Sequence, residues 1–130
     1  MPARLALPLL LVALAALPAA AQTLTGAEWH VVDLAGTAPT PSAAPTLTFT
    51  ADGKVSGHSG CNRFAGGWAQ DGLQLTFTAM AGTRMACEPA RMEVEAAMLR
   101  AFEGVTTVAL TPGGALELLG ADGLLIRAVR

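Results

Sequence analysis

The stretch from Gly57 to Trp68, Gly-His-Ser-Gly-Cys-Asn-Arg-Phe-Ala-Gly-Gly-Trp, constrains the fold of this chain more than any other. It contains four glycines and one of the two cysteines, Cys61. Glycine is required where the backbone takes a positive φ or passes close to another group. We therefore expect a tight turn around Cys61 and Asn62, followed by a strand. The second cysteine ends a companion stretch, Thr83-Arg84-Met85-Ala86-Cys87, and the rest of the chain is expected to hold the two stretches together.

The first 21 residues are expected to be a cleaved signal peptide. Arg4 gives a basic start, and Leu5–Leu17 is an apolar run with the length of a signal-peptide core, shorter than a membrane span. Ala19-Ala20-Ala21 then fits the small-residue cleavage pattern, so the mature chain is expected to start at Gln22. An uncleaved N-terminal anchor is the alternative. No cysteine lies near the cleavage point, so we expect no lipid anchor.

Residues 22–130 are expected to form a single domain. They number 109 (130 minus 21), which is enough for one hydrophobic core. Without Arg4 they carry 7 basic (8 minus 1) and 10 acidic residues, a net charge of −3. With no basic patch and no basic amphipathic helix, we expect neither nucleic-acid nor membrane-surface binding, and no membrane span after cleavage.

Short alternating runs separated by turn residues predict an antiparallel sheet. The turn signals are Asp52-Gly53, Asp71-Gly72, Pro112–Gly114 and Asp122-Gly123. The expected strands are Trp29–Leu34, Leu47–Thr50, Lys54–Ser56, Phe64–Gln70, Leu73–Phe77, Val105–Leu110, Ala115–Leu119 and Leu124–Val129. Met80–Cys87 shows no clear period. About eight such strands are expected to curl into a barrel, which removes strand edges.

One helix is predicted after Glu88-Pro89, because proline is tolerated in the first helical turn. Its apolar face is expected to comprise Val94, Ala97, Met98, Ala101 and Phe102, and its solvent face Glu93, Arg100 and Glu103. Arg91 and Glu95 are expected to form an i,i+4 ion pair. The predicted class is α+β: a mostly antiparallel, partly open barrel-like sheet of about eight short strands, packed against one inserted helix.

These residues resemble the META-domain family, which includes bacterial heat-shock proteins of the HslJ type. The match begins with Gly26, Trp29 and Leu47-Thr48-Phe49, and Glu95 fits an acidic position in the helix. Its most specific part joins Val55–Gly66 to Thr83–Cys87, and the whole match covers roughly Leu24 to Arg130. The motif residues that the resemblance assigns are Gly57, Gly60, Cys61, Asn62, Arg63, Gly66, Thr83, Arg84, Met85 and Cys87. It implies a small exported domain of the cell envelope, periplasmic or secreted, associated with tolerance of heat and antibiotics, with no known catalytic mechanism.

For Cys61 and Cys87 we expect a disulfide, because export permits one. A bridge of this span would stabilise the fold by about 3–4 kcal/mol through the entropy of the unfolded chain. Two close reduced thiols and a redox pair are the alternatives. The absence of Cys-x-x-Cys spacing argues against the redox pair.

Other chemistry is weakly supported by the motif. A hydrolase using Ser59 and His58 would need a nucleophile elbow, but Cys61 replaces its last glycine and a strand follows instead of a helix. Zinc held by His30, His58 and the two cysteines would lack a recognised ligand spacing, so we expect no metal and no cofactor. Asn62 is expected to shape the turn, because asparagine tolerates the left-handed region and bonds its own backbone.

Arg63 and Arg84 are expected either to pair with Glu88 or Glu95, or to form an anion site. We expect a monomeric, non-catalytic envelope domain that acts through contacts with another envelope protein. The alternatives are a barrel that binds an apolar ligand or lipid in its interior and, more weakly, the hydrolase.

Overall fold

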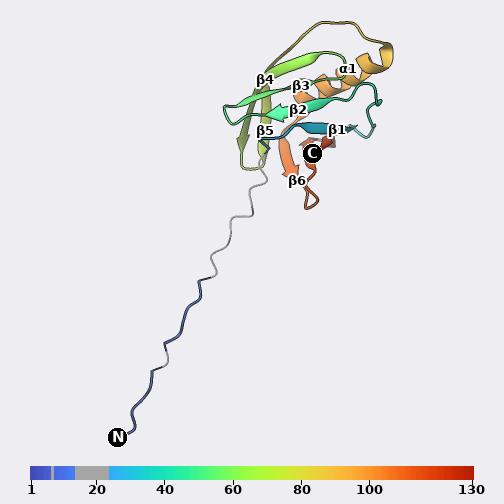
Figure 1. Cartoon of the computed structure of the whole chain (residues 1–130). Helices are drawn as coiled ribbons and strands as arrows, with labels where there is room; N and C mark the ends of the chain where they lie inside the picture. The colour runs from blue at the N-terminus through green and yellow to red at the C-terminus, as the bar shows by residue number, and fades with distance from the viewer. Residues whose placement is uncertain (7, 14–23) are drawn as a thin grey trace.

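The computed structural model describes residues 1–6, 8–13 and 24–130 of the chain. Eight strands form a closed barrel in chain order, each antiparallel to the next, and the last strand pairs with the first. One helix is inserted after the fifth strand and covers one side (Figure 1). The elements are β1 (Trp29–Leu34), β2 (Thr46–Phe49), β3 (Lys54–His58), β4 (Arg63–Asp71), β5 (Gln74–Gly82), α1 (Pro89–Gly104), β6 (Thr107–Leu110), β7 (Leu116–Gly120) and β8 (Gly123–Val129). The predicted α+β class, with its mostly antiparallel sheet, is confirmed.

The largest departure from the predicted strands is β5, which continues to Gly82 instead of ending at Phe77. The pairing register with β4 shifts between Ala65 and Gly67, opposite a left-handed Ala79 with φ 52°. This bulge inserts an extra residue and reverses the side-chain alternation beyond it. The sequence beyond Phe77 therefore lacks a regular period although it is strand.

The barrel interior is packed with apolar side chains from all eight strands. The most fully buried of them are Trp29, Leu47, Phe49, Val55, Leu75, Leu116, Leu118 and Ile126. From α1, Met98, Ala101 and Phe102 join this core, and the Phe102 ring lies 5.0 Å from that of Phe64 and 4.9 Å from that of Phe77. The helix is thus held mainly by one face, as the apolar periodicity predicts.

The helix also differs from expectation in its charged residues. Glu95 is buried and shares its stripe with Met98 and Phe102 at i+3 and i+7. The expected Arg91–Glu95 pair is wrong, because Arg91 Nε donates to the Gly60 carbonyl at 2.8 Å and lies 4.0 Å from Glu88. Val94 and Ala97 are only partly buried against the core.

A disulfide joins Cys61, in the turn between β3 and β4, to Cys87, just before α1. Their Cα atoms lie 5.9 Å apart, which confirms the expected bridge. Residues 83–88 have no regular secondary structure. The bridge therefore fixes a segment that no strand ladder or helix holds.

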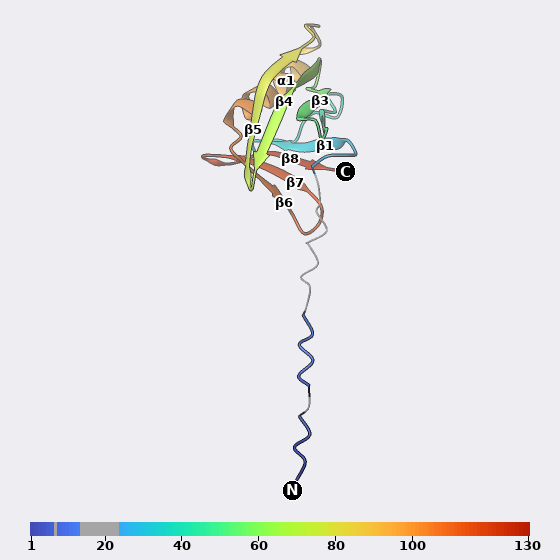
Figure 2. The same cartoon turned by 90° about the vertical axis from the view of Figure 1, so that its left-hand side faces the viewer.

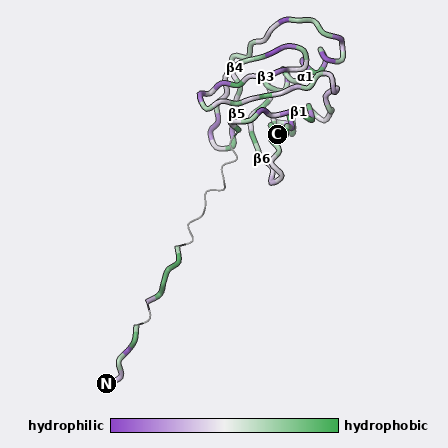
Figure 3. Tube along the Cα trace, viewed as in Figure 1, coloured by the Kyte–Doolittle hydropathy of each residue, from purple (hydrophilic) through white to green (hydrophobic). Residues whose placement is uncertain are grey.

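Residues 1–6 and 8–13 lie away from the barrel and are exposed (Figure 2). Residues 8–13 are apolar (Figure 3). The expected cleavage site, Ala19–Ala21 before Gln22, lies outside the described residues. In the part of the chain that is described, no helix has the length and hydropathy of a membrane span.

Replacing Phe102 with Ala should lower the free energy of unfolding by about 3–5 kcal/mol, because the ring is 4% exposed and touches two other aromatic rings. Urea unfolding measures the effect. The matched control is Glu93→Ala on the exposed side of the same helix, which should cost less than about 0.5 kcal/mol. Equal midpoints for the two variants would contradict the observed helix face.

Reducing the disulfide should lower the free energy of unfolding by about 3.5 kcal/mol, because the bridged residues are 26 apart in sequence. For a domain of this size the unfolding temperature should fall by about 15 °C. Calorimetry with and without reductant measures the shift. A Cys61→Ser/Cys87→Ser variant is the control, and it should unfold at the reduced temperature in both buffers; an unchanged wild-type midpoint after reduction would refute the prediction.

Candidate functional site

The glycine-rich turn lies directly against α1. Ser59 and Asn62 close the turn, with the Ser59 N–H donating to the Asn62 carbonyl at 2.9 Å. Gly60 has φ +119°, and a Cβ there would lie 3.1 Å from the Arg91 carbonyl oxygen and from a methyl of Val94. Any larger residue at this position would combine backbone strain with a clash against the helix. Glycine thus permits the turn to touch the helix backbone.

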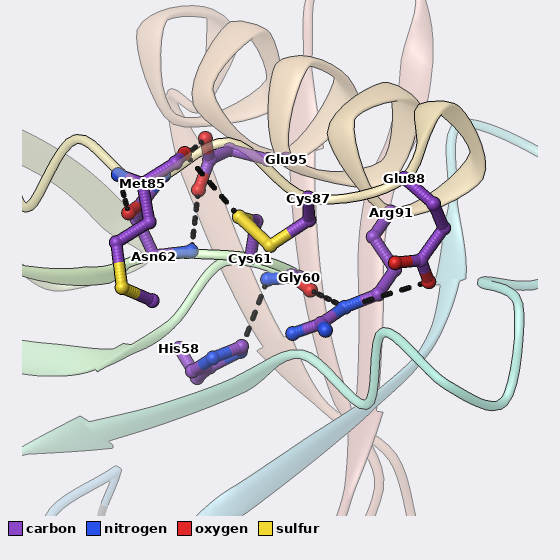
Figure 4. Close-up of polar contacts among 9 residues, drawn as sticks. All are labelled: His58, Gly60, Cys61, Asn62, Met85, Cys87, Glu88, Arg91 and Glu95. Atoms are coloured by element: carbon purple, nitrogen blue, oxygen red, sulfur yellow. Dashed lines mark hydrogen bonds and ion pairs between the residues drawn. A yellow bond between two sulfur atoms is a disulfide. The ribbon is translucent and has the colours of Figure 1, made fainter.

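Glu95 reaches from α1 into the turn and is the centre of the site. Its Oε1 accepts hydrogen bonds from Ser59 Oγ at 2.6 Å and from the Asn62 main-chain N–H at 2.8 Å. Its Oε2 accepts from Asn62 Nδ2 at 3.0 Å. Both carboxylate oxygens are thus satisfied by groups of the turn (Figure 4).

Asn62 links this carboxylate to the segment before the helix. Its Oδ1 accepts from the Met85 N–H at 2.6 Å and from Thr83 Oγ1 at 3.0 Å. Its Nδ2 donates to the Met85 carbonyl at 3.0 Å as well as to Glu95. All four hydrogen-bonding positions of the amide are therefore used.

Asn62 helps to close the turn through its carbonyl, while the positive φ in this turn belongs to Gly60. The amide side chain shapes the site by bridging three segments. The Cys61–Cys87 bridge runs beside it, and the Cys61 sulfur lies 3.4 Å from the Met85 carbonyl oxygen. The turn, residues 83–87 and α1 therefore form one connected unit, which we call the Glu95 cluster.

The environment of Glu95 favours its charged form. Burial raises the pKa of this carboxyl, but the hydrogen bonds from Ser59 and from the side chain and main chain of Asn62 outweigh burial. The pKa of Glu95 is consequently lowered from its ordinary value. A buried carboxylate with this set of donors acts as a fixed acceptor and is a poor proton donor near neutral pH.

The side chains of Ser59 and His58, the residues of the hydrolase hypothesis, bond different partners and not each other. Ser59 Oγ lies within hydrogen-bond distance of Glu95 and of the Asn62 carbonyl, whereas His58 Nδ1 accepts from the Gly60 N–H at 3.2 Å. His30 and His58 flank Thr46 in neighbouring strands, about 10 Å apart by strand spacing. Among the described residues, no group of three or more His, Cys, Asp or Glu is arranged to hold a metal ion.

A pocket of about 590 Å³ lies on the outer side of the Glu95 cluster. One wall is formed by residues 80–86 and the other by Met92 and Leu99 of α1, with Glu95 between them. Arg63 and Arg84 also line it, and both are exposed. Neither forms an ion pair with any described residue, so the expected pairing with Glu88 or Glu95 is wrong.

Of the motif glycines, Gly60 lies in the turn beside α1, whereas Gly57 lies within β3 and Gly66 within β4. The sequence did not indicate the burial of Glu95 or the role of Ser59. A Cβ on Gly57 would lie 2.0 Å from the Thr46 carbonyl oxygen, which explains a glycine in mid-strand. A signal for Glu95 was present, because it precedes Met98 and Phe102 by three and seven residues on the buried stripe. For Ser59, no pattern in the sequence indicates a partner 36 residues away.

Replacing Glu95 with Gln should remove part of the acid sensitivity of folding. As the pH falls, the unfolded chain takes up the proton before the folded chain, because folding lowers the pKa of Glu95. The stabilisation is therefore complete above about pH 4.3 and is lost as the pH falls through the lowered pKa. Urea unfolding at pH 7 and pH 3 should show a smaller difference for Glu95→Gln than for the wild type.

Glu95→Gln should also be less stable at pH 7, because its NH₂ group meets the Asn62 amide donor or leaves other donors unsatisfied. The control is Asp52→Asn, at the exposed turn after β2, where a hydrogen bond from Thr50 likewise lowers the pKa of the carboxyl. Most of the acid-dependent loss should remain in this variant. A pH dependence identical in wild type and Glu95→Gln would exclude the role given to Glu95.

The chain matches a known protein family and several solved structures. The family model described as META domain matches residues 22–130. No curated protein matches the chain. A solution structure of a protein from Burkholderia xenovorans is similar at 32% identity and TM-score 0.65, with 82% of this chain and 83% of that chain covered.

Two further solved structures share the fold. A second solution structure is 28% identical with TM-score 0.65, covering 82% of this chain and 91% of that one. A crystal structure of a DUF4847 family protein from Bacteroides vulgatus ATCC 8482 is 16% identical with TM-score 0.60, covering 83% and 94%, and shows likeness of fold alone. The barrel, the inserted helix and the match over the whole of residues 22–130 lead to one conclusion: the chain belongs to the META-domain family.

Proposed function

We propose that this protein is a non-catalytic domain exported to the cell envelope, where it supports tolerance of heat or antibiotics through contacts with another protein. The observation that carries the proposal is the saturation of the Glu95 cluster. Its carboxylate, amide and hydroxyl are committed to one another, and the described residues contain no buried side-chain polar atom without a partner. A reactive group would need a free donor or acceptor for its substrate.

The disulfide supports the proposed compartment. Structural disulfides persist in oxidising environments such as the periplasm and are rare in the cytosol. Cys61 and Cys87 are bridged across two segments that have no other covalent tie. Family membership supports the link to envelope stress, and the apolar run of Leu5–Leu17 supports export.

The apolar-ligand alternative receives less support than a protein contact. The barrel interior is filled by packed side chains such as Leu47, Leu116 and Leu118, each fully buried. The 590 Å³ pocket lies outside the ring of strands, between residues 80–86 and α1. An open surface of this kind suits a macromolecular partner better than an enclosed lipid.

A deletion strain tests the proposal. Growth after heat or antibiotic challenge should be restored by the full chain and not by a chain lacking residues 2–21, because the second protein stays in the cytosol. Intact-mass measurement of the exported protein should give a mature start at Gln22. A mature protein that retains Met1 would contradict cleavage of the signal peptide.

The same strain separates a contact role from catalysis. His58→Ala should restore tolerance as well as the wild type, because the hydrogen bond of the His58 side chain is a local one, accepted from the Gly60 N–H. Loss of rescue by a folded, exported His58→Ala protein would favour the hydrolase. Rescue by the cytosolic form would refute an envelope role.

A further inference from the structure

The strand pairing of the barrel is much shorter between β5 and β6 than between β4 and β5. β5 pairs with β4 along almost its whole length, from Asp71↔Gln74 to Phe64↔Gly82. With β6 it has a single registered pair, Gln74↔Thr107. Figure 2 shows β4 and β5 rising together past the end of β6. Among the described strands, residues 77–82 of β5 thus have no partner on their second edge.

Part of the main chain at the end of β5 faces away from β4. The Thr83 N–H donates to the Arg63 carbonyl, on the β4 side of the strand. Since successive residues of a strand point their N–H and C=O groups to opposite edges, those of Gly82 face away from β4. Met80, Ala81 and Gly82 all line the 590 Å³ pocket, together with Met92, Glu95 and Leu99 of α1.

The pocket walls are apolar and adaptable. Three of the five methionines of the chain, Met80, Met85 and Met92, line it together with Leu99. Met85 is 61% exposed and Leu99 is 40% exposed. Methionine is flexible and polarisable, and it is common on surfaces that accommodate varied peptide side chains.

The positive charges of Arg63 and Arg84 in the pocket favour an acidic occupant. Arg63 and Arg84 are exposed and have no ion-pair partner among the described residues. The one carboxylate in the lining, Glu95, is already bonded by three donors of the turn. A second copy of the chain, paired edge to edge, would bring like charges together, whereas an acidic segment would pair with both arginines.

We propose that the free edge of β5 binds an extended acidic peptide segment of a partner protein, which adds a strand beside Met80–Gly82. Apolar side chains of the peptide lie among Met80, Met85 and Leu99, and a carboxylate lies at Arg63 and Arg84. This mode combines main-chain hydrogen bonds for affinity with side-chain pockets for specificity. The inference rests on the proposed contact function and specifies its partner.

The test uses a fluorescent, end-blocked peptide of about eight residues, within ordinary strand lengths, that alternates Val and Asp. Fluorescence anisotropy with the exported protein should show saturable binding. Amide shifts in NMR spectra should locate it to residues 77–86 and α1. A peptide alternating Val and Lys should bind at least about tenfold more weakly, as should the acidic peptide with its alternate amides methylated. Equal binding of the acidic and basic peptides, or shifts confined to other strands, would overturn the proposal.

Arg63→Glu/Arg84→Glu should weaken binding of the acidic peptide at least about tenfold, while Arg100→Glu, an exposed change on α1 outside this pocket, should leave it unchanged. Unfolding temperatures of both variants check that they fold. A wild-type dimer that dissociates in the double variant would overturn the proposal in favour of a second copy.

The deletion strain distinguishes this inference from the proposed function. Failure of the double variant to restore tolerance would support the free edge of β5 and its pocket as the contact surface. Full rescue by a double variant that no longer binds the peptide would refute this contact surface and leave the proposed function standing. No rescue by the wild type would refute the proposed function, and peptide binding would then decide the inference alone.

Discussion

The buried carboxylate of Glu95 is the interaction on which the arrangement of this domain depends. Helix, turn and the segment before the helix come from distant parts of the sequence, and the bonds to Ser59 and Asn62 hold them in register. Hydrogen bonds to a charged group are worth about 1.5–3 kcal/mol each. A buried charge is costly if it loses its partners, so the cluster favours one geometry over every shifted alternative.

Three different kinds of contact reinforce the same junction. The disulfide joins the turn to Cys87, the Asn62 amide joins it to Met85, and the Arg91 guanidinium joins it to the helix through Gly60. Residues 83–88 have no ladder of their own, and their order comes from these side-chain and covalent ties. The pocket wall that these residues form is consequently rigid in its main chain and variable in its methionine side chains.

Much of the architecture was readable from local signals. The four turn signals and the alternating runs predicted all eight strands, and the 3.6-residue period predicted α1. The continuation of β5 was hidden because a bulge at Ala79 breaks the alternation on which strand prediction depends. Arg91 and Glu95 have helical pair spacing, but the choice of partner was decided by atoms of the turn more than thirty residues away. Side-chain clusters of this kind depend on tertiary proximity, which spacing along one element does not encode.

The pairing of β1 with β8 sets when the domain can finish folding. A ribosome releases the N-terminal end first, so β1 emerges before its partner β8. Arg130, just after β8, stacks over the Trp29 ring at 4.0 Å and donates to the carbonyls of Leu24 and Thr25. Before β8 is made, β1 lacks its ladder partner, and the Trp29 ring lacks the Arg130 guanidinium that covers it. The barrel therefore cannot close until β8 is present, and a chain without β8 would expose the edge of β1 and the Trp29 ring, two features that favour aggregation.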